Sequence, residues 1–322
     1  MTALLASIPS PPRNTIEIGP LTVYFYGVLI AIGVIVAVVV AKQRYERFGG
    51  DGELVDRIAI WAVAFGFLGA RMAYVSTHLS RFEGRPWAIL FIWEGGLALY
   101  GGLTVGSLTA LYLLRKWDGD IWAFADATAV GIPLAQAIGR WGNYFNQELF
   151  GTPSTLPWAV EIDPVNRPPQ FAEFSTFHPT FLYESLWNLL LTVPIILWLE
   201  RKGKLAKGSS FAVYVMVYGT GRFLMELLRT DTSFRLLGLS RNGWVSAVAV
   251  IGAAIAFRIL QRRAEPRALV GEPSFFSPGE PTTSMPDAAD RDPEGVDGPA
   301  EVASAGGPTE GEPDDPHRDA GE

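Results

Sequence analysis

Gly-Arg-Trp-Gly-Asn-Tyr-Phe-Asn-Gln-Glu-Leu-Phe-Gly, residues 139–151, follows directly after the apolar run Ile121–Ile138. We expect a helix that ends at the first glycine, so that Arg140, Asn143 and Glu148 come immediately after it. Many membrane helices end in a single arginine, but few end in so dense a group of polar side chains. Because a guanidinium fork suits a phosphodiester, this stretch is predicted to bind an anionic lipid head group.

Long apolar runs repeat along the chain, which is 49% hydrophobic and 18% charged. A membrane span needs about 20 mainly apolar residues. Seven segments qualify as spans: Leu21–Ala41, Asp56–Thr77, Leu97–Leu114, Ile121–Ile138, Phe181–Leu199, Ser209–Leu228 and Gly243–Leu260. The predicted fold is therefore an all-α polytopic membrane protein with seven transmembrane helices.

The charge of the chain is unevenly placed. Residues 264–322 hold 15 Asp and Glu against three Arg, a net charge of −12, whereas residues 1–263 carry +5. The tail also holds 10 of the 23 prolines and has no apolar period, which is typical of disorder. We expect an N-terminal arm over residues 1–20, a membrane domain over residues 21–263 and a disordered acidic tail.

Cysteine is absent, which excludes disulfides, thiolate metal sites and a cysteine nucleophile within this chain. The three histidines show no zinc-ligand spacing, so we expect no metal site. We also expect no cofactor and no nucleic-acid partner.

The basic residues set the expected orientation, because Lys and Arg accumulate in cytoplasmic links. Four alternating segments are rich in them: Lys42, Arg44, Arg47 and Arg57; Arg115 and Lys116; Arg201, Lys202, Lys204 and Lys207; Arg258, Arg262 and Arg263. The N-terminus is therefore predicted outside and the C-terminus in the cytoplasm.

Two of the outer loops are more than short links. The link that ends at His178 has five prolines and the alternating run Trp158–Ile162, which predicts a small extracytoplasmic cap with some β structure over about residues 144–178. The apolar piece Pro86–Trp93 is too short to span. It could lie at the membrane interface or pack on the bundle, and both readings stay open.

Polar residues of six spans fall at one depth near the outer face in this topology. They are Tyr24, Tyr26, Arg71, Glu94, Tyr100, Arg140, Asn143, His178, Tyr183, Glu184, Arg222, Glu226 and Arg229. Ionisable residues inside a span are costly and mark functional sites. Singly, several of them have a structural alternative. Arg222 and Glu226 could form a plain ion pair, Arg71 could reach the head groups, His178 could cap the next span, and Tyr26 or Tyr100 could belong to an aromatic belt. Asp126 lies near the inner end of the span Ile121–Ile138 and is expected to serve a helix start or an ion pair.

Helical spacing groups these residues further. Arg222, Glu226 and Arg229 are four and three residues apart, so they share one face of a helix. The four arginines of the layer are matched by four glutamates, which we expect to orient the guanidinium groups. From the residues alone, the chain is a membrane protein that acts on an anionic lipid.

The motifs resemble those of the bacterial prolipoprotein diacylglyceryl transferase family over roughly residues 16–260. The resemblance rests on Gly19-Pro20, Tyr26-Gly27, Gly69-Ala-Arg71, Trp93-Glu-Gly-Gly96, Gly101-Gly-Leu103, Gly139-Arg-Trp-Gly-Asn143 with Asn146, Glu148 and Gly151, His178-Pro-Thr-Phe-Leu-Tyr-Glu184, and Tyr218-Gly-Thr-Gly-Arg222 with Glu226 and Arg229. It implies a transferase in the bacterial plasma membrane that moves a diacylglyceryl group from phosphatidylglycerol to the lipobox cysteine behind a prolipoprotein signal peptide. A thioether forms and glycerol 1-phosphate leaves.

The resemblance also implies roles for individual residues. Arg140 and Arg222 would hold the phosphate, and the lipid site would include Tyr26, Asn143, Glu148, Gly151, Glu226 and Arg229. Many members of the family have a histidine where this chain has Tyr100. The general base therefore stays open among Tyr100, His178 and Glu148. A lipid transporter or flippase is the alternative function, and it would favour polar residues through the full depth of the membrane.

Overall fold

The computed structural model describes residues 7–19, 21–91, 95–229 and 235–263. The chain divides into two units, Met1–Pro273 and Ser274–Glu322, and every described residue belongs to the first. The predictions for Glu94 and for the acidic tail lie outside the described residues.

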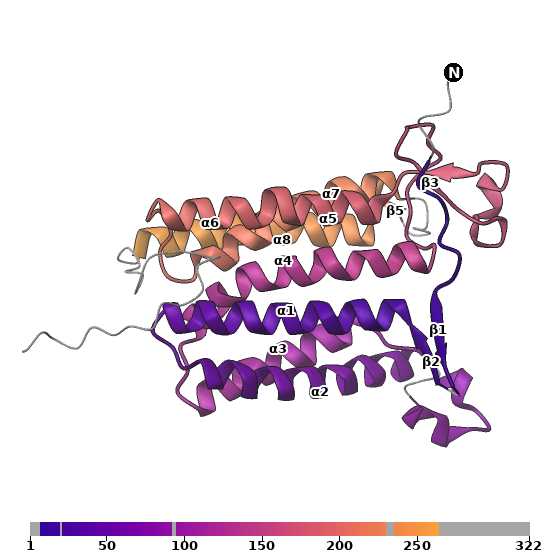
Figure 1. The fold of residues 1–322 in the computed structure, drawn as a ribbon. Helices are drawn as coiled ribbons and strands as arrows, with labels where there is room; N and C mark the ends of the chain where they lie inside the picture. Colours follow the sequence, from indigo (N-terminus) through magenta and orange to yellow (C-terminus); the bar gives the residue numbers. More distant parts are fainter. Residues whose placement is uncertain (1–6, 20, 92–94, 230–234, 264–322) are drawn as a thin grey trace, which may run out of the picture. The chain divides into compact units, whose positions relative to one another are not determined.

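Helices dominate the described chain (Figure 1). Their bounds are α1 Phe25–Arg47, α2 Gly52–Thr77, α3 Leu99–Lys116, α4 Ile121–Phe145, α5 Thr180–Trp187, α6 Val193–Arg201, α7 Ser209–Leu228 and α8 Arg241–Arg263. Within the described ranges, six helical stretches are long and apolar enough to cross a membrane: α1, α2, α4, the run Thr180–Arg201, α7 and Arg241–Arg262 of α8. The protein is thus a mostly helical, multi-pass membrane protein. Helix α3 is 18 residues long, ends in two basic residues, and is not among these six.

Local chemistry explains where two of the helices begin. The Asp120 side chain accepts hydrogen bonds from the backbone N–H groups of Trp122 and Ala123 at the start of α4. Asp51 accepts one from the backbone of Glu53 in the same way and starts α2. Such caps satisfy N–H groups that have no partner within the helix.

The first helix starts later than the sequence predicted. Residues Leu21–Tyr24 form strand β2, which pairs antiparallel with β1 (Thr15–Ile18), and α1 begins only at Phe25. The apolar run was read as one helix, but its first four residues alternate and find a strand partner just upstream.

The run Thr180–Arg201 is one helical stretch with a wider turn inside it. Helix α5 passes into a π-helical turn, η6 (Asn188–Thr192), before α6 begins. Pro194 stands at the start of α6 and has no N–H to donate to the preceding turn, so the backbone must change its hydrogen-bond pattern at this point.

Helix α4 does not end at Gly139 as predicted, but continues to Phe145. Its late glycines serve packing instead of termination. A Cβ atom on Gly142 would lie 2.2 Å from the Tyr26 ring, so only glycine lets α1 approach this turn of α4. Arg140 and Asn143 therefore lie within the last two turns of the helix, where their side chains have a fixed direction.

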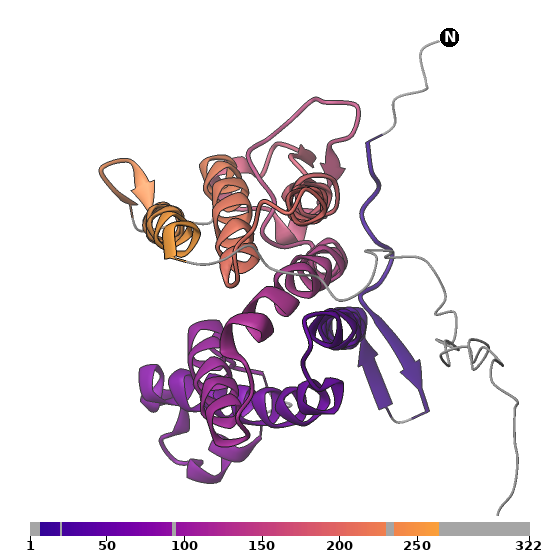
Figure 2. The ribbon, with the colours of Figure 1, turned by 90° about the vertical axis from the view of Figure 1, so that its left-hand side faces the viewer.

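The helices lie side by side, and α1 packs along α4, α2 along α3, and α7 along α8 (Figures 1 and 2). Small residues permit close approach between them, as in many membrane helix pairs. A Cβ atom on Gly101 of α3 would lie 2.5 Å from the carbonyl oxygen of Gly69 on α2. Glycine at this position therefore lets α2 and α3 approach closely.

Short strands and turns occupy the helix connections at the end where α4 ends and α5 begins. Strand β3 (Val160–Glu161) pairs with β4 (Thr176–Phe177), and β5 (Arg235–Leu236) pairs with β6 (Leu239–Ser240). The remaining short elements are the 3₁₀ turns η1 Leu79–Phe82, η2 Pro86–Leu90, η4 Pro164–Asn166 and η5 Pro169–Phe171. Phe150, Val160, Ile162, Phe177 and Phe181 form a small core beneath β3 and β4. The β structure expected around Trp158–Ile162 is thus present.

Candidate functional site

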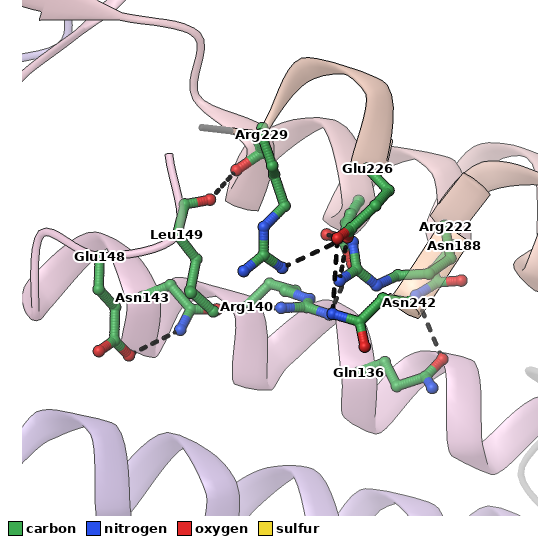
Figure 3. A network of polar contacts seen from close by, with 12 residues as sticks. Gln136, Arg140, Asn143, Glu148, Leu149, Asn188, Arg222, Glu226, Arg229 and Asn242 are labelled. Atoms are coloured by element: carbon green, nitrogen blue, oxygen red, sulfur yellow. Dashed lines mark hydrogen bonds and ion pairs between the residues drawn. The ribbon is translucent and has the colours of Figure 1, made fainter. Parts of the chain in front are cut away.

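The end of α4 starts a string of polar contacts. Arg140 Nη1 donates to Asn143 Oδ1 over 3.3 Å, and Asn143 Nδ2 donates to Glu148 Oε1 over 2.9 Å (Figure 3). Asn143 is buried, whereas Glu148 is exposed. The three residues that the sequence placed together are therefore joined, with the arginine at the inner end and the carboxylate at the open end.

The loop that carries Glu148 is held in a strained conformation. Its neighbours Gln147 and Leu149 both have left-handed backbones, with φ of 50° and 58°. For residues with a Cβ atom this conformation costs roughly 1–2 kcal/mol each. The Gln147 amide exchanges two hydrogen bonds with Asp163, and Thr180 donates to the carbonyl of Leu149. These contacts offset the strain and fix the position of Glu148.

Glu184 of α5 joins two arginines from distant parts of the chain. Its Oε2 lies 2.7 Å from Arg140 Nη2 on α4, and its Oε1 lies 3.6 Å from Arg222 Nη1 on α7. Glu184 is 5% exposed, so the carboxylate is buried between the two guanidinium groups. The sequence placed all three residues at one depth, and the structure brings them into contact.

Glu226 forms ion pairs with Arg222 and Arg229. Its Oε2 lies 2.6 Å from Arg222 Nη2, one helical turn away, and 3.8 Å from Arg229 Nη1. The three guanidinium groups point toward one another in Figure 3. We call Arg140, Glu184, Arg222, Glu226 and Arg229 the arginine cluster. The expectation that glutamates pair with these arginines is confirmed for Glu184 and Glu226.

Four buried polar atoms in or beside the cluster lack a hydrogen bond to the described residues: Glu184 Oε2, Asn188 Oδ1, Arg222 Nη1 and Glu226 Oε2. The two carboxylate oxygens have close ion pairs instead, with Arg140 and with Arg222. Arg222 Nη1 has no acceptor, because its contact with Glu184 is only an ion pair at 3.6 Å. Asn188 Oδ1 has no donor, although its Nδ2 lies 3.5 Å from Gln136 Oε1. A buried donor without an acceptor is costly, and Arg222 is therefore placed to bind an anion. The described residues contain no group of three His, Asp or Glu side chains that could hold a metal ion.

Gly151 and Tyr26 close the site around Arg140 and Asn143. The backbone N–H of Gly151 donates to the carbonyl of His178, and Gly151 pairs with Arg229 in an antiparallel bridge. A Cβ atom there would lie 2.9 Å from the His178 side chain. Glycine is thus needed where the loop meets the end of α7. Tyr26 interacts electrostatically with Glu148 and Arg140 and approaches the side chain of Asn143.

His178 forms a chain of contacts with two aromatic residues. Trp158 Nε1 donates to the Tyr183 hydroxyl, which lies 3.1 Å from His178 Nδ1. Because the indole can only donate, the Tyr183 proton is available to Nδ1, and the imidazole then carries its own proton on Nε2. Burial lowers the pKa of His178 below its ordinary value, which favours this neutral form.

Tyr100 contacts the cluster only through another side chain. It lies in the first turn of α3, and its hydroxyl donates to Asn242 Oδ1 on α8 over 2.9 Å. Asn242 in turn lies 3.5 Å from Glu226 Oε1. Asn242 and Ser240 were absent from the predicted site. The available signal is the polar run Ser240-Arg-Asn242 just before the last apolar segment Gly243–Leu260.

Arg71, which the sequence placed at the same depth, binds backbone carbonyls and not the carboxylates of the arginine cluster. Its guanidinium donates to the backbone carbonyls of Ala88, Ile89, Phe91, Gly95 and Gly96. The group also stacks on Phe82 and Tyr74. Carbonyls of η2 and of the loop after it occupy its nitrogens, so Arg71 organises this segment. Trp87 and Leu90 of η2 are exposed.

A second buried polar group lies near the opposite ends of the helices. Arg44 of α1 forms a 2.7 Å ion pair with Glu200 and donates to the carbonyls of Asp126 and Ala127. The Asp126 carboxylate accepts from the backbone N–H groups of Gly208 and Phe211 at the start of α7. Asp126 serves a helix start, as expected, although the helix is a neighbouring one.

Comparisons with known proteins agree with this arrangement. The model of the prolipoprotein diacylglyceryl transferase family matches residues 13–259. A phosphatidylglycerol–prolipoprotein diacylglyceryl transferase of Frankia alni is 45% identical over 266 residues, which are 82% of this chain and 70% of the relative. A transferase of the same name from Streptomyces coelicolor is 42% identical over 80% of this chain and 82% of its own length. Another, from Paenarthrobacter aurescens, is 41% identical over 80% of this chain and 84% of its own. With the matched region running from before α1 into α8 and enclosing the whole arginine cluster, the chain belongs to the prolipoprotein diacylglyceryl transferase family.

Proposed function

We propose that this protein transfers the diacylglyceryl group of phosphatidylglycerol to the lipobox cysteine of a prolipoprotein. The observation that carries the proposal is the convergence of Arg140 and Arg222 on Glu184, with Arg222 Nη1 buried and without a hydrogen-bond acceptor. A phosphodiester oxygen supplies the missing acceptor and lies naturally between two guanidinium forks. The names of the relatives support the same substrates.

The proposed reaction is a displacement at the glyceryl carbon that bears the phosphate. The cysteine thiolate of the second substrate attacks this carbon and forms a C–S bond. The bond between the same carbon and the phosphate ester oxygen breaks. The electron pair of the broken bond stays on the phosphate oxygen, so glycerol 1-phosphate leaves. Arg140 and Arg222 stabilise the charge that grows on the departing phosphate. Because the chain has no cysteine, the sulfur comes from the prolipoprotein.

The thiol must lose its proton before it attacks, and we place the base at Glu148. A thiol has an ordinary pKa near 8.5 and reacts as the thiolate. The carboxylate of Glu148 is exposed and stands at the end of the string from Arg140 through Asn143. Tyr100 directs its own proton to an amide oxygen, and His178 has Nδ1 occupied by Tyr183. Neither arrangement favours these residues as the base.

The expected topology is part of the proposal. Helix α3 would be a seventh span, because it packs along α2 and its exposed side includes Leu103 and Leu108. The arginine cluster would then face the outer leaflet of the bacterial plasma membrane, with the N-terminus outside and the C-terminus in the cytoplasm. Residues 144–178 would form an extracytoplasmic cap above the cluster.

A direct assay of group transfer tests the proposal. Phosphatidylglycerol labelled in its diacylglyceryl group is incubated with the purified protein and a peptide that contains a lipobox cysteine. Appearance of the label on the cysteine, together with release of glycerol 1-phosphate, supports the function. A protein that moves the lipid between leaflets but leaves the peptide unlabelled is a transporter, and the proposal fails.

A further inference from the structure

We propose that Asn242 is a positioning residue for the arginine cluster and that Tyr100 acts through it. The inference rests on the proposed function and adds to it an identified role for the residue at position 100. Its basis is a continuous series of contacts from α3, across the start of α8, to the carboxylate of Glu226.

The start of α8 divides the two oxygens of Glu226 between different tasks. Oε1 accepts from Ser240 Oγ over 2.7 Å and lies 3.5 Å from Asn242 Nδ2. Ser240 Oγ is itself held by the backbone N–H of Gly243. Oε2 is left to Arg222 and Arg229. Contacts on Oε1 therefore decide how Glu226 presents its other oxygen to Arg222, the arginine with an unsatisfied nitrogen.

Tyr100 selects the orientation of the Asn242 amide. A phenol hydroxyl donates to an amide oxygen, and the bond to Oδ1 leaves Nδ2 directed at Glu226. With the amide reversed, Oδ1 would face the Glu226 carboxylate and repel it. An amide oxygen cannot remove the tyrosine proton, so the pair positions the cluster and does not relay a proton.

The expected effects follow from this order of contacts. Asn242→Ala removes a hydrogen bond to a charged group and lets Glu226 turn, so we expect kcat/KM for phosphatidylglycerol to fall about tenfold. Asn242→Asp has the same shape but places a negative charge opposite Glu226, and the loss should be larger. Since the contacts reach only the lipid side of the site, the KM for the lipobox peptide should not change. A variant that merely unfolds part of the protein would lower kcat/KM for phosphatidylglycerol and for the lipobox peptide alike.

A double-mutant cycle in full-length protein in nanodiscs tests the proposal. Transfer by the wild-type protein is measured first, and its absence would overturn the proposed function itself. Tyr100→Phe, Asn242→Ala and the double variant are then compared. If Tyr100 acts through Asn242, Tyr100→Phe lowers the rate in the wild-type background and has no further effect beside Asn242→Ala, within about twofold.

Two results would overturn the inference. One is an equal loss from Tyr100→Phe in both backgrounds, which would mean that the hydroxyl contributes independently of Asn242. The other is wild-type kinetics for both Asn242→Ala and Asn242→Asp. Matched controls are Tyr112→Phe, an exposed tyrosine on the same helix α3, and Asn166→Ala, an exposed asparagine in η4. Both should retain wild-type kcat/KM.

Discussion

Replacement of Arg140 tests the core of the proposed mechanism. Its two terminal nitrogens contact Glu184 over 2.7 Å and Asn143 over 3.3 Å, so the side chain is fixed from two directions. Loss of one fixed donor to a developing negative charge costs about 2.7–4 kcal/mol, or roughly a hundredfold to a thousandfold in rate. Arg140→Ala also leaves Glu184 with Arg222 as its only partner in the cluster. We therefore expect kcat/KM to fall on the order of a thousandfold.

Arg140→Lys separates charge from geometry. A lysine keeps the positive charge, but its single nitrogen cannot contact Glu184 and Asn143 together while it also binds a phosphate. The expected loss is about tenfold to a hundredfold, between wild type and the alanine variant. Both variants should remain folded, because Glu184 keeps its ion pair with Arg222.

The assay is transfer of label from phosphatidylglycerol to a lipobox peptide by purified protein in nanodiscs, with thermal unfolding as the check on folding. Arg57→Ala is the matched control. Arg57 is also an ion-paired arginine, but it lies on α2 with its side chain 54% exposed, and such pairs contribute about 0–1 kcal/mol. If folded Arg140→Ala keeps more than a tenth of the wild-type kcat/KM, the phosphate-binding role of Arg140 is wrong.

Three further substitutions address the framework of the site. Gly142→Ala forces a methyl group into the Tyr26 ring and should lower the free energy of unfolding by about 1–3 kcal/mol. The control is Gly252→Ala, in open space on α8, which should change it by no more than about 1 kcal/mol. Because burial lowers the pKa of His178, the unfolded chain takes up a proton at this residue before the folded protein does. The melting temperature should therefore decrease as pH falls from 7.5 through 6.5 toward 5, and His178→Gln should reduce that slope; an unchanged slope would contradict the assignment. Asp126→Ala leaves two N–H groups at the start of α7 without their acceptor, so we expect a loss of about 0.5–2 kcal/mol in thermal unfolding and unchanged transfer per folded molecule.

Periodicity and spacing predicted the parts of the site that lie on one helix. Arg222 and Glu226 are four residues apart, and their ion pair follows from the geometry of α7 alone. The string from Arg140 through Asn143 to Glu148 also spans few residues, so these three side chains have to lie close together. What spacing cannot predict is the meeting of Arg140 and Arg222 on Glu184, because that contact depends on how α5 packs between α4 and α7.

The structure departs from the prediction at one helix end and adds one contact that the sequence does not reveal. Gly139 was taken as a helix end, since glycine is a poor helix former, but close packing against α1 favours glycine inside this helix. For Tyr100 the sequence suggests a base or a place in an aromatic belt, but it does not reveal that the hydroxyl meets Asn242, 142 residues later. Contacts over such separations are set by tertiary packing.

The buried arginines show how structural and functional charges can be told apart. The sequence places Arg71 and Arg222 together in the outer polar layer and Arg44 in a cytoplasmic link, and it does not reveal what any of them binds. Arg44 has a carboxylate and two carbonyls as acceptors, and Arg71 has the carbonyls of one loop. Arg222 is equally surrounded by protein, yet one of its terminal nitrogens has no acceptor. Folding alone gives no reason to bury an unsatisfied donor, so we expect its acceptor to arrive with the substrate. By the same criterion we expect Arg71 to serve the backbone that it binds and not the lipid.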